Sequence, residues 1–129
     1  MADLPQDSSL TYYLQQARAK AKENRFEEAL ADAATALNLA LQQEEIDLIQ
    51  AIRAEIKQAR DRRVQELSGY LRSLLARPLD DLDRDALQKA STGGQEAFSE
   101  LQSVDPLAAQ PLAAGWNTLK SRIETRLDL

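Results

Sequence analysis

Apolar residues recur along the chain at the three- and four-residue intervals of an α-helix. The first such segment begins near Ser8 or Ser9, which are suitable N-caps. Its apolar positions share one helical face: Leu10, Tyr13, Leu14, Ala17 and Ala21. After an interruption at Asn24-Arg25, a second segment carries the same pattern at Phe26, Ala29, Leu30, Ala33, Leu37, Ala40 and Leu41. The short connection predicts an antiparallel pair of helices.

A third segment continues the helical pattern from about Glu44 to Ala76 without a proline. Its apolar positions are Ile49, Ile52, Ile56, Ala59, Leu67, Leu71 and Leu74, with a weaker patch at residues 60–63. At 1.5 Å per residue this helix would be about 50 Å long. Because the first hairpin cannot cover that length, the C-terminal half must pack on other partners. Arg77-Pro78 is predicted to end the helix.

Caps and breakers divide the rest of the chain. Asp80 or Asp81 is predicted to cap a fourth helix that stops at Gly93. Thr92 and Gln95 then resemble a capping box for a short fifth helix. Asp105-Pro106 is a suitable start for the last helix, although Pro111 predicts that this helix either kinks or begins there. The apolar positions of the last helix are Leu112, Trp116, Leu119, Ile123 and Leu127.

These patterns predict an all-α fold of about six antiparallel helices. Valine is rare, and no stretch alternates apolar with polar residues as a half-buried strand does. The length predicts a single domain over residues 1–129, with a three-helix unit at 9–76 and the C-terminal helices at 79–129.

Residues 12–42 resemble a tetratricopeptide repeat, a helical hairpin. The turn residue Asn24 and the aromatic Phe26 open its second helix, and small residues follow where two helices pack closely. The other positions that fit are Tyr13, Ala17, Ala29, Ala33, Ala36 and Leu37. Three positions depart from the family's pattern, since Gln16, Lys20 and Leu41 stand where Leu, Tyr and Pro are usual. The pattern occurs convincingly once, whereas a solenoid needs at least three repeats.

Residues 11–74 are also similar to the microtubule-interacting and transport domain. The stretch FEEAL at 26–30 resembles the opening of that family's second helix, and AIRAEIKQARDRRVQELSGYLR at 51–72 resembles its long third helix. Nothing in residues 79–129 belongs to that plan. Both resemblances imply the same role, a helical surface on which other proteins dock.

The residue types present leave little room for catalysis. The chain contains no His and no Cys, so the usual activated nucleophiles and their base are missing. Ser121 and Lys120 point to different helical faces, and no S-x-x-K motif occurs. Gly93-Gly94 lacks the preceding strand and following lysine of a phosphate-binding loop, and a helix stop is the better interpretation. We therefore expect no enzymatic activity and no cofactor.

The run DDLDRDA offers the only candidate for a metal site. Asp81, Asp83 and Asp85 have the spacing of the first ligands of a calcium loop. Such a loop requires Gly at its sixth position and Glu at its twelfth, where this chain has Ala86 and Thr92. Acidic residues that complement a helix N-terminus explain the run better, so we expect no metal.

Charge is distributed unevenly. The net charge is −5 and the pI about 4.8, which disfavours binding to nucleic acid. A basic cluster nevertheless lies on the third helix at Arg53, Lys57, Arg60, Arg62 and Arg63, and within it Arg53, Lys57 and Arg60 form a stripe on one helical face. We call the candidate surface Arg53, Lys57, Arg60 and Arg63 the basic stripe. It is either a docking surface for an acidic partner or a solvated face. If the fourth helix folds back, its acidic start should neutralise Arg72 and Arg77 before it reaches the stripe.

Trp116, the only tryptophan, lies on the apolar face of the last helix. It is expected either to pack in the core or to anchor a partner, because tryptophan is enriched at interface hot spots. With Arg53, Lys57, Arg60 and Arg63, it completes the candidate partner surface.

The leading hypothesis is a non-enzymatic helical module that binds a peptide or helix of another protein in a groove between its helices. The alternative is a structural bundle that self-associates into homo-oligomers through the third helix. A third hypothesis is docking of nucleic acid or an anionic membrane through the basic stripe, although neither is expected as the main partner. The start has no basic or apolar signal segment, and we expect a soluble, cytoplasmic, bacterial protein.

Overall fold

The computed structural model describes residues 5–128, in which every regular element is helical and no strand occurs. The all-α prediction is confirmed, but the described residues form five α-helices where about six were expected. Their bounds, with one 3-10 turn, are α1 Pro5–Lys22, α2 Phe26–Leu39, α3 Gln43–Ala76, η1 Leu79–Asp81, α4 Arg84–Val104 and α5 Pro106–Asp128. The chain divides into two compact units, Met1–Arg63 and Val64–Leu129. The division falls inside α3.

The connection between α1 and α2 lies where the sequence predicts it. Asn24 has a positive φ of 64°, a conformation that Asn tolerates better than most residues. The Arg25 N–H donates to the Lys20 carbonyl at 2.9 Å, and the Asn24 N–H donates to the Ala21 carbonyl at 3.0 Å. These two bonds close the last turn of α1 in the Schellman arrangement, so the chain reverses within three residues.

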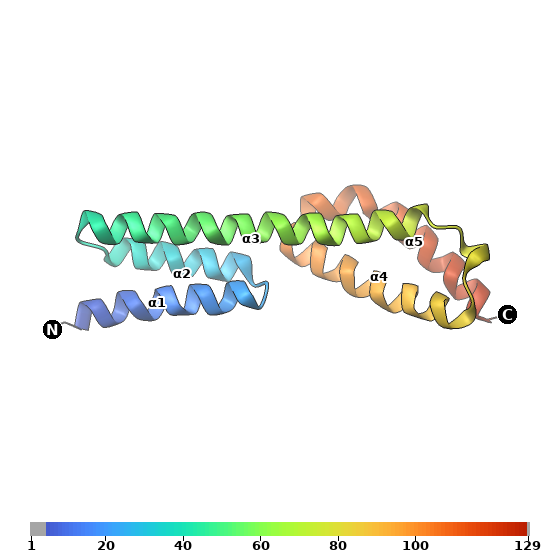
Figure 1. The fold of residues 1–129 in the computed structure, drawn as a ribbon, viewed down its shortest axis with the longest axis horizontal. Helices are drawn as coiled ribbons and strands as arrows, with labels where there is room; N and C mark the ends of the chain where they lie inside the picture. Colours follow the sequence, from blue (N-terminus) through green and yellow to red (C-terminus); the bar gives the residue numbers. More distant parts are fainter. Residues whose placement is uncertain (1–4, 129) are drawn as a thin grey trace. The chain divides into compact units, whose positions relative to one another are not determined.

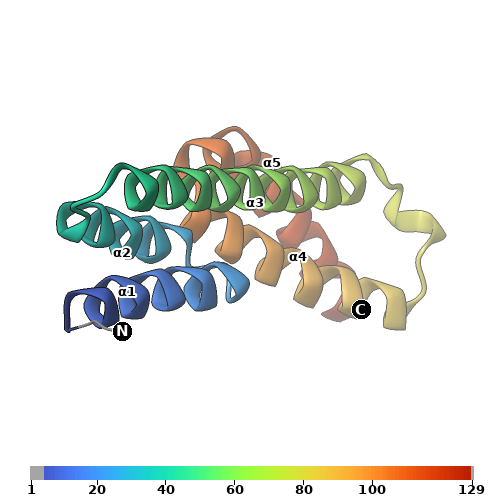
Figure 2. The ribbon, with the colours of Figure 1, turned by 60° about the vertical axis from the view of Figure 1, so that its left-hand side comes forward.

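Small side chains hold α1 and α2 close together, and the two helices lie side by side in both views of the ribbon (Figures 1 and 2). Ala17 of α1 and three alanines of α2 are completely buried: Ala29, Ala33 and Ala36. Lys20, which departs from the repeat pattern, pairs with Asp32 across the two helices at 2.7 Å. Both side chains are largely buried, so this ion pair fixes the register of the hairpin.

The first half of α3 completes unit 1 (Figure 1). Its isoleucines Ile49, Ile52 and Ile56 are at most 3% exposed. The helix begins at Gln43 because the Glu45 carboxylate accepts hydrogen bonds from the N–H groups of Leu41 and Gln42, at 3.0 and 3.1 Å.

Two boundaries of unit 1 differ from the prediction. The first helix begins at Pro5 and not at Ser8 or Ser9. Proline is suited to the first position of a helix, because an N–H group there would have no carbonyl partner within the helix. The second helix ends at Leu39, so Leu41 is not part of its apolar stripe and is 74% exposed in the connection.

Unit 2 is built from the second half of α3 together with α4 and α5. As predicted from its length, the C-terminal half of α3 packs on other helices: Leu67, Leu71 and Leu74 join one apolar cluster with α4 and α5. The members from those helices are Leu87, Ala90, Ala97, Phe98, Leu101, Ala109, Leu112, Trp116, Leu119 and Ile123.

The predicted helix stop at Gly93 is wrong, and with it the short fifth helix. Helix α4 runs through both glycines from Arg84 to Val104, and neither has a positive φ. A Cβ atom added at Gly93 would overlap the Tyr70 hydroxyl, and one added at Gly94 would overlap the indole ring of Trp116. Glycine is therefore used here for close packing between helices rather than for a turn.

The predicted N-cap of α4 is wrong, whereas the predicted N-cap of α5 is confirmed. Helix α4 is capped by Asp83, whose carboxylate accepts from the Ala86 N–H at 2.8 Å, and not by Asp80 or Asp81, which lie in η1. Helix α5 begins at Pro106 after the N-cap Asp105, as predicted. It continues through Pro111, so the last helix does not begin there.

Candidate functional site

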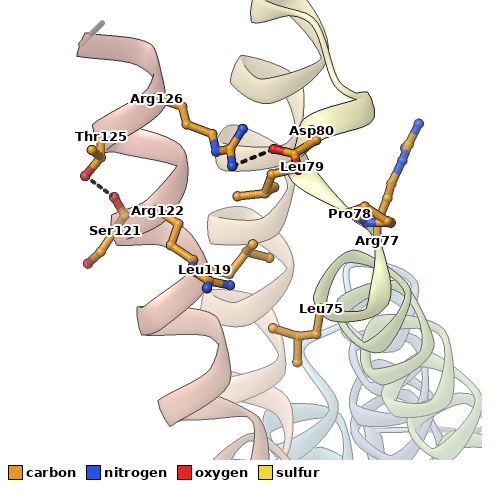
Figure 3. A pocket seen from close by; sticks show the side chains of 10 residues that line it. All are labelled: Leu75, Arg77, Pro78, Leu79, Asp80, Leu119, Ser121, Arg122, Thr125 and Arg126. Carbon is orange, nitrogen blue, oxygen red and sulfur yellow. Dashed lines mark hydrogen bonds and ion pairs between the residues drawn. The ribbon is translucent and has the colours of Figure 1, made fainter.

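An open groove lies in unit 2 between the end of α3 and α5 (Figure 3). It has a volume of about 490 Å³ and is lined by Leu75, Arg77, Pro78, Leu79, Asp80, Leu119, Ser121, Arg122, Thr125 and Arg126. A second hollow of about 390 Å³ shares Leu75, Leu119 and Arg122 with it and extends along α5 past Thr118 and Gly115 to Ala114. We call the two together the α5 groove.

The floor of the α5 groove is apolar. Leu119 belongs to the core of unit 2 and is 7% exposed, while Leu75 and Leu79 pack against that core and remain half-buried. Figure 3 shows Leu75 and Leu119 directed toward the space between the two helices. A Cβ atom at Gly115 would lie 3.3 Å from Leu75 Cδ1, so glycine allows the two helices to approach closely at this point. Half-buried leucines at an open groove are available to pack on a ligand.

The rim of the α5 groove is basic. Three of its lining residues are arginines, Arg77, Arg122 and Arg126, and one is an acid, Asp80. Asp80 bonds to Arg126 at 2.8 Å, as Figure 3 shows. The expectation that the acidic start of the fourth helix neutralises Arg77 first is therefore wrong for Asp80, because η1 turns its carboxylate toward α5.

The basic stripe predicted on the third helix lies in unit 1, along one side of α3. Lys57 is exposed, whereas Arg53, Arg60 and Arg63 are partly buried. The Nε atoms of Arg53 and Arg60 are buried without a hydrogen-bond partner, and Arg60 Nε is 3.8 Å from the Asp61 carboxylate. The stems of these arginines thus cover apolar surface, which leaves Lys57 as the most accessible charge of the stripe.

Trp116 does not belong to an exposed surface. It has no solvent exposure, and its indole N–H donates to the Gln95 side chain at 3.2 Å. The ring packs against Gly94 in the centre of unit 2. The core interpretation of Trp116 therefore fits the structure, and its place in the candidate partner surface is corrected.

The acidic side chains at residues 80–85 take part in a helix cap and in ion pairs rather than in one common site. Asp83 caps α4, Asp80 pairs with Arg126, and Asp85 lies 3.4 Å from Lys89. Within residues 5–128, no group of three Asp, Glu, His or Cys side chains is placed to hold a metal ion. None of the helices in that range is long and apolar enough to cross a membrane.

The arginines of the α5 groove are not among the site residues predicted from the sequence. A signal was present on the last helix, since Arg122 and Arg126 follow the apolar position Leu119 at i+3 and i+7 and therefore lie on the same side of that helix. What the sequence could not supply is the opposite wall, which comes from Leu75 and η1.

Comparison of the chain with protein-family models, with curated proteins and with solved structures finds no match. The function therefore has to be inferred from the residues of the chain itself.

Proposed function

We propose that this protein is a non-enzymatic helical module that binds a segment of another protein in the α5 groove. The observation that carries the proposal is an open groove of about 490 Å³ whose floor contains half-buried leucines. A groove between two helices is a common way to receive a peptide or a third helix, because its ridges accept side chains at regular spacing. The sequence resemblance of residues 12–42 and 11–74 to helical docking domains implies the same class of function, although it lies outside the residues that line the groove.

The alternative, self-association through α3, has less support. The isoleucines and leucines of its apolar stripe are already buried within the two units: Ile49, Ile52, Ile56, Leu67, Leu71 and Leu74. The large apolar residues that stay exposed on α3 are Leu48 and Tyr70, which lie 22 positions apart and form no continuous seam for a second copy. Docking of nucleic acid through the basic stripe also has less support, because the arginines of the stripe are partly buried and the net charge is −5.

The proposal is tested by selecting random 16-residue peptides, displayed on phage, against the immobilised full chain. Two variants of α5 then locate the binding site. Thr118→Trp places a bulky side chain in the α5 groove, and Asn117→Trp adds the same side chain at an exposed position that does not line it.

We expect enriched peptides to bind the wild type and the Asn117→Trp variant alike, and to lose about tenfold or more in affinity for Thr118→Trp. Such a loss corresponds to removal of one well-packed anchor. No enrichment, or binding that ignores Thr118→Trp, would overturn the proposal.

A further inference from the structure

The charge of the α5 groove is opposite to the charge of the whole chain. Its lining residues include three arginines and one aspartate, whereas the chain has a net charge of −5. A local positive field in an acidic protein selects anionic ligands and accelerates their association. The groove thus has an electrostatic preference opposite to the one expected from the net charge of the chain.

Two of the arginines are not used within the fold. In the part of the chain that the structure describes, the side chains of Arg77 and Arg122 form no hydrogen bond or ion pair, while the Arg126 side chain pairs with Asp80. Arg122 is directed into the groove in Figure 3, and Arg77 extends from the opposite wall toward solvent. Because Arg77 is exposed, its long side chain can turn toward a ligand in the groove. The guanidinium fork of arginine matches a carboxylate with two parallel hydrogen bonds.

The apolar floor argues for a protein segment rather than a small anion. A phosphate or other simple anion would contact the arginines but would leave the half-buried Leu75 and Leu79 uncovered. A peptide can place an apolar side chain on those leucines and an acidic one on the rim at the same time. From Ala114 to Arg126 the wall formed by α5 is about 18 Å long, enough for several residues of a bound segment.

We propose that the α5 groove binds an acidic segment of another protein, whose carboxylates pair with Arg122 and Arg77 and whose large apolar side chain packs on the half-buried Leu75 and Leu79. This inference rests on the proposed function, since it names the chemistry of the partner for the same groove. The apolar contact supplies most of the affinity, and the charges supply selectivity and a fast association rate.

The test reads the composition of the peptides selected on the full chain and then measures their affinity for charge-reversal variants by fluorescence anisotropy. The variant Arg77→Glu/Arg122→Glu changes two exposed residues without partners, so the fold should be kept. The matched control Arg18→Glu/Arg62→Glu reverses two exposed arginines of unit 1 and changes the net charge equally. Circular dichroism melts check that both variants are folded.

We expect enriched peptides to combine Asp or Glu with Leu, Phe or Trp. Their affinity should fall by on the order of 10- to 100-fold in Arg77→Glu/Arg122→Glu and by less than about threefold in the control. Raising the salt concentration should weaken binding to the wild type.

Three results would overturn the inference. The first is enrichment of apolar peptides without acidic residues, whose binding is weakened by Thr118→Trp but not by Arg77→Glu/Arg122→Glu. This would refute the acidic partner and leave binding in the groove intact. An equal loss in the control variant would show that the net charge, not the groove, selects the ligand. No enrichment, together with binding to phosphatidylserine vesicles, would refute both this inference and the proposed function.

Discussion

Helix α4 packs closely on Trp116 at Gly94, and the replacement of Gly94 by alanine tests how unit 2 is packed. A Cβ atom there would lie 3.0 Å from Cζ2 of the indole and closer still to the outer edge of the ring. Trp116 is fully buried and is held by a hydrogen bond to Gln95, so the ring has little room to move. Gly69, in the exposed side of α3, is the matched control, because an added Cβ there meets no atom within 4 Å.

Two effects oppose each other in Gly94→Ala. Alanine is favoured over glycine inside a helix by about 1 kcal/mol. Forcing a methyl group into a filled core costs about 1–3 kcal/mol, and displacement of the indole that breaks its bond to Gln95 adds about 1 kcal/mol. We therefore expect Gly94→Ala to lower the free energy of unfolding by about 1–3 kcal/mol. Gly69→Ala should raise it by about 0.5–1 kcal/mol, since only the helix preference acts.

The assay is urea unfolding followed by circular dichroism and by the fluorescence of Trp116, the only tryptophan in the chain. In a Trp116→Phe background, the smaller ring leaves space for the methyl group. The cost of Gly94→Ala should then shrink by about 1 kcal/mol or more, which measures the coupling between the two positions. If Gly94→Ala proves as stable as Gly69→Ala, the close packing of α4 on Trp116 is refuted.

Three further predictions concern the hairpin of α1 and α2. Asn24→Val should lower the free energy of unfolding by about 1–2 kcal/mol because of its positive φ, whereas Asn24→Gly should cost little, as thermal melts would show. Asp32→Leu should cost about 1–2 kcal/mol by leaving Lys20 without its partner, and adding Lys20→Met should recover most of that loss; no recovery would refute the pairing. The hydrogen bond from Arg25 lowers the pKa of Glu28 below its ordinary 4.5, so its contribution to stability is present above pH 4.5 and is lost as the pH falls through the lower, folded pKa. A carboxyl NMR titration should return the Glu28 pKa toward 4.5 in the Arg25→Gln variant, and an unchanged pKa would contradict the cause.

The sequence predicts best those elements whose signals are local. Three such features depend on the backbone preferences of a few adjacent residues, and the structure has them where expected. They are the turn at Asn24-Arg25, the N-cap at Asp105 and the end of α3 before Pro78. Among several neighbouring aspartates, however, local preference cannot decide which one caps α4. The 3-10 turn η1 occupies Asp80 and Asp81, and this leaves the cap to Asp83.

The prediction fails where tertiary packing overrides local preference. Two adjacent glycines favour a helix stop, yet α4 continues through Gly93 and Gly94 because Tyr70 and Trp116 fill the space beside them. These contacts link residues more than twenty positions apart, which no local pattern records.

The same distinction applies to the candidate site. The basic stripe was predictable because its residues lie on one helix, but the partial burial of Arg53 and Arg60 was not, since it depends on how their stems pack. The α5 groove exists only after Leu75 and Leu119 are brought together by the fold. The spacing of Arg122 and Arg126 in the sequence already places them on one side of α5. The opposite wall, formed by Leu75 and η1, cannot be read from any local spacing.

Binding in the α5 groove is tested most directly by titrating the ¹⁵N-labelled full chain with a peptide selected on it and following the amide signals by two-dimensional NMR. If the peptide binds in the groove, the largest changes in amide chemical shift fall on Leu75, Gly115, Leu119 and Arg122, and they are absent in Thr118→Trp. Changes that instead cluster on Lys57 and its neighbours in α3, with the α5 groove unaffected, would show that the peptide binds elsewhere.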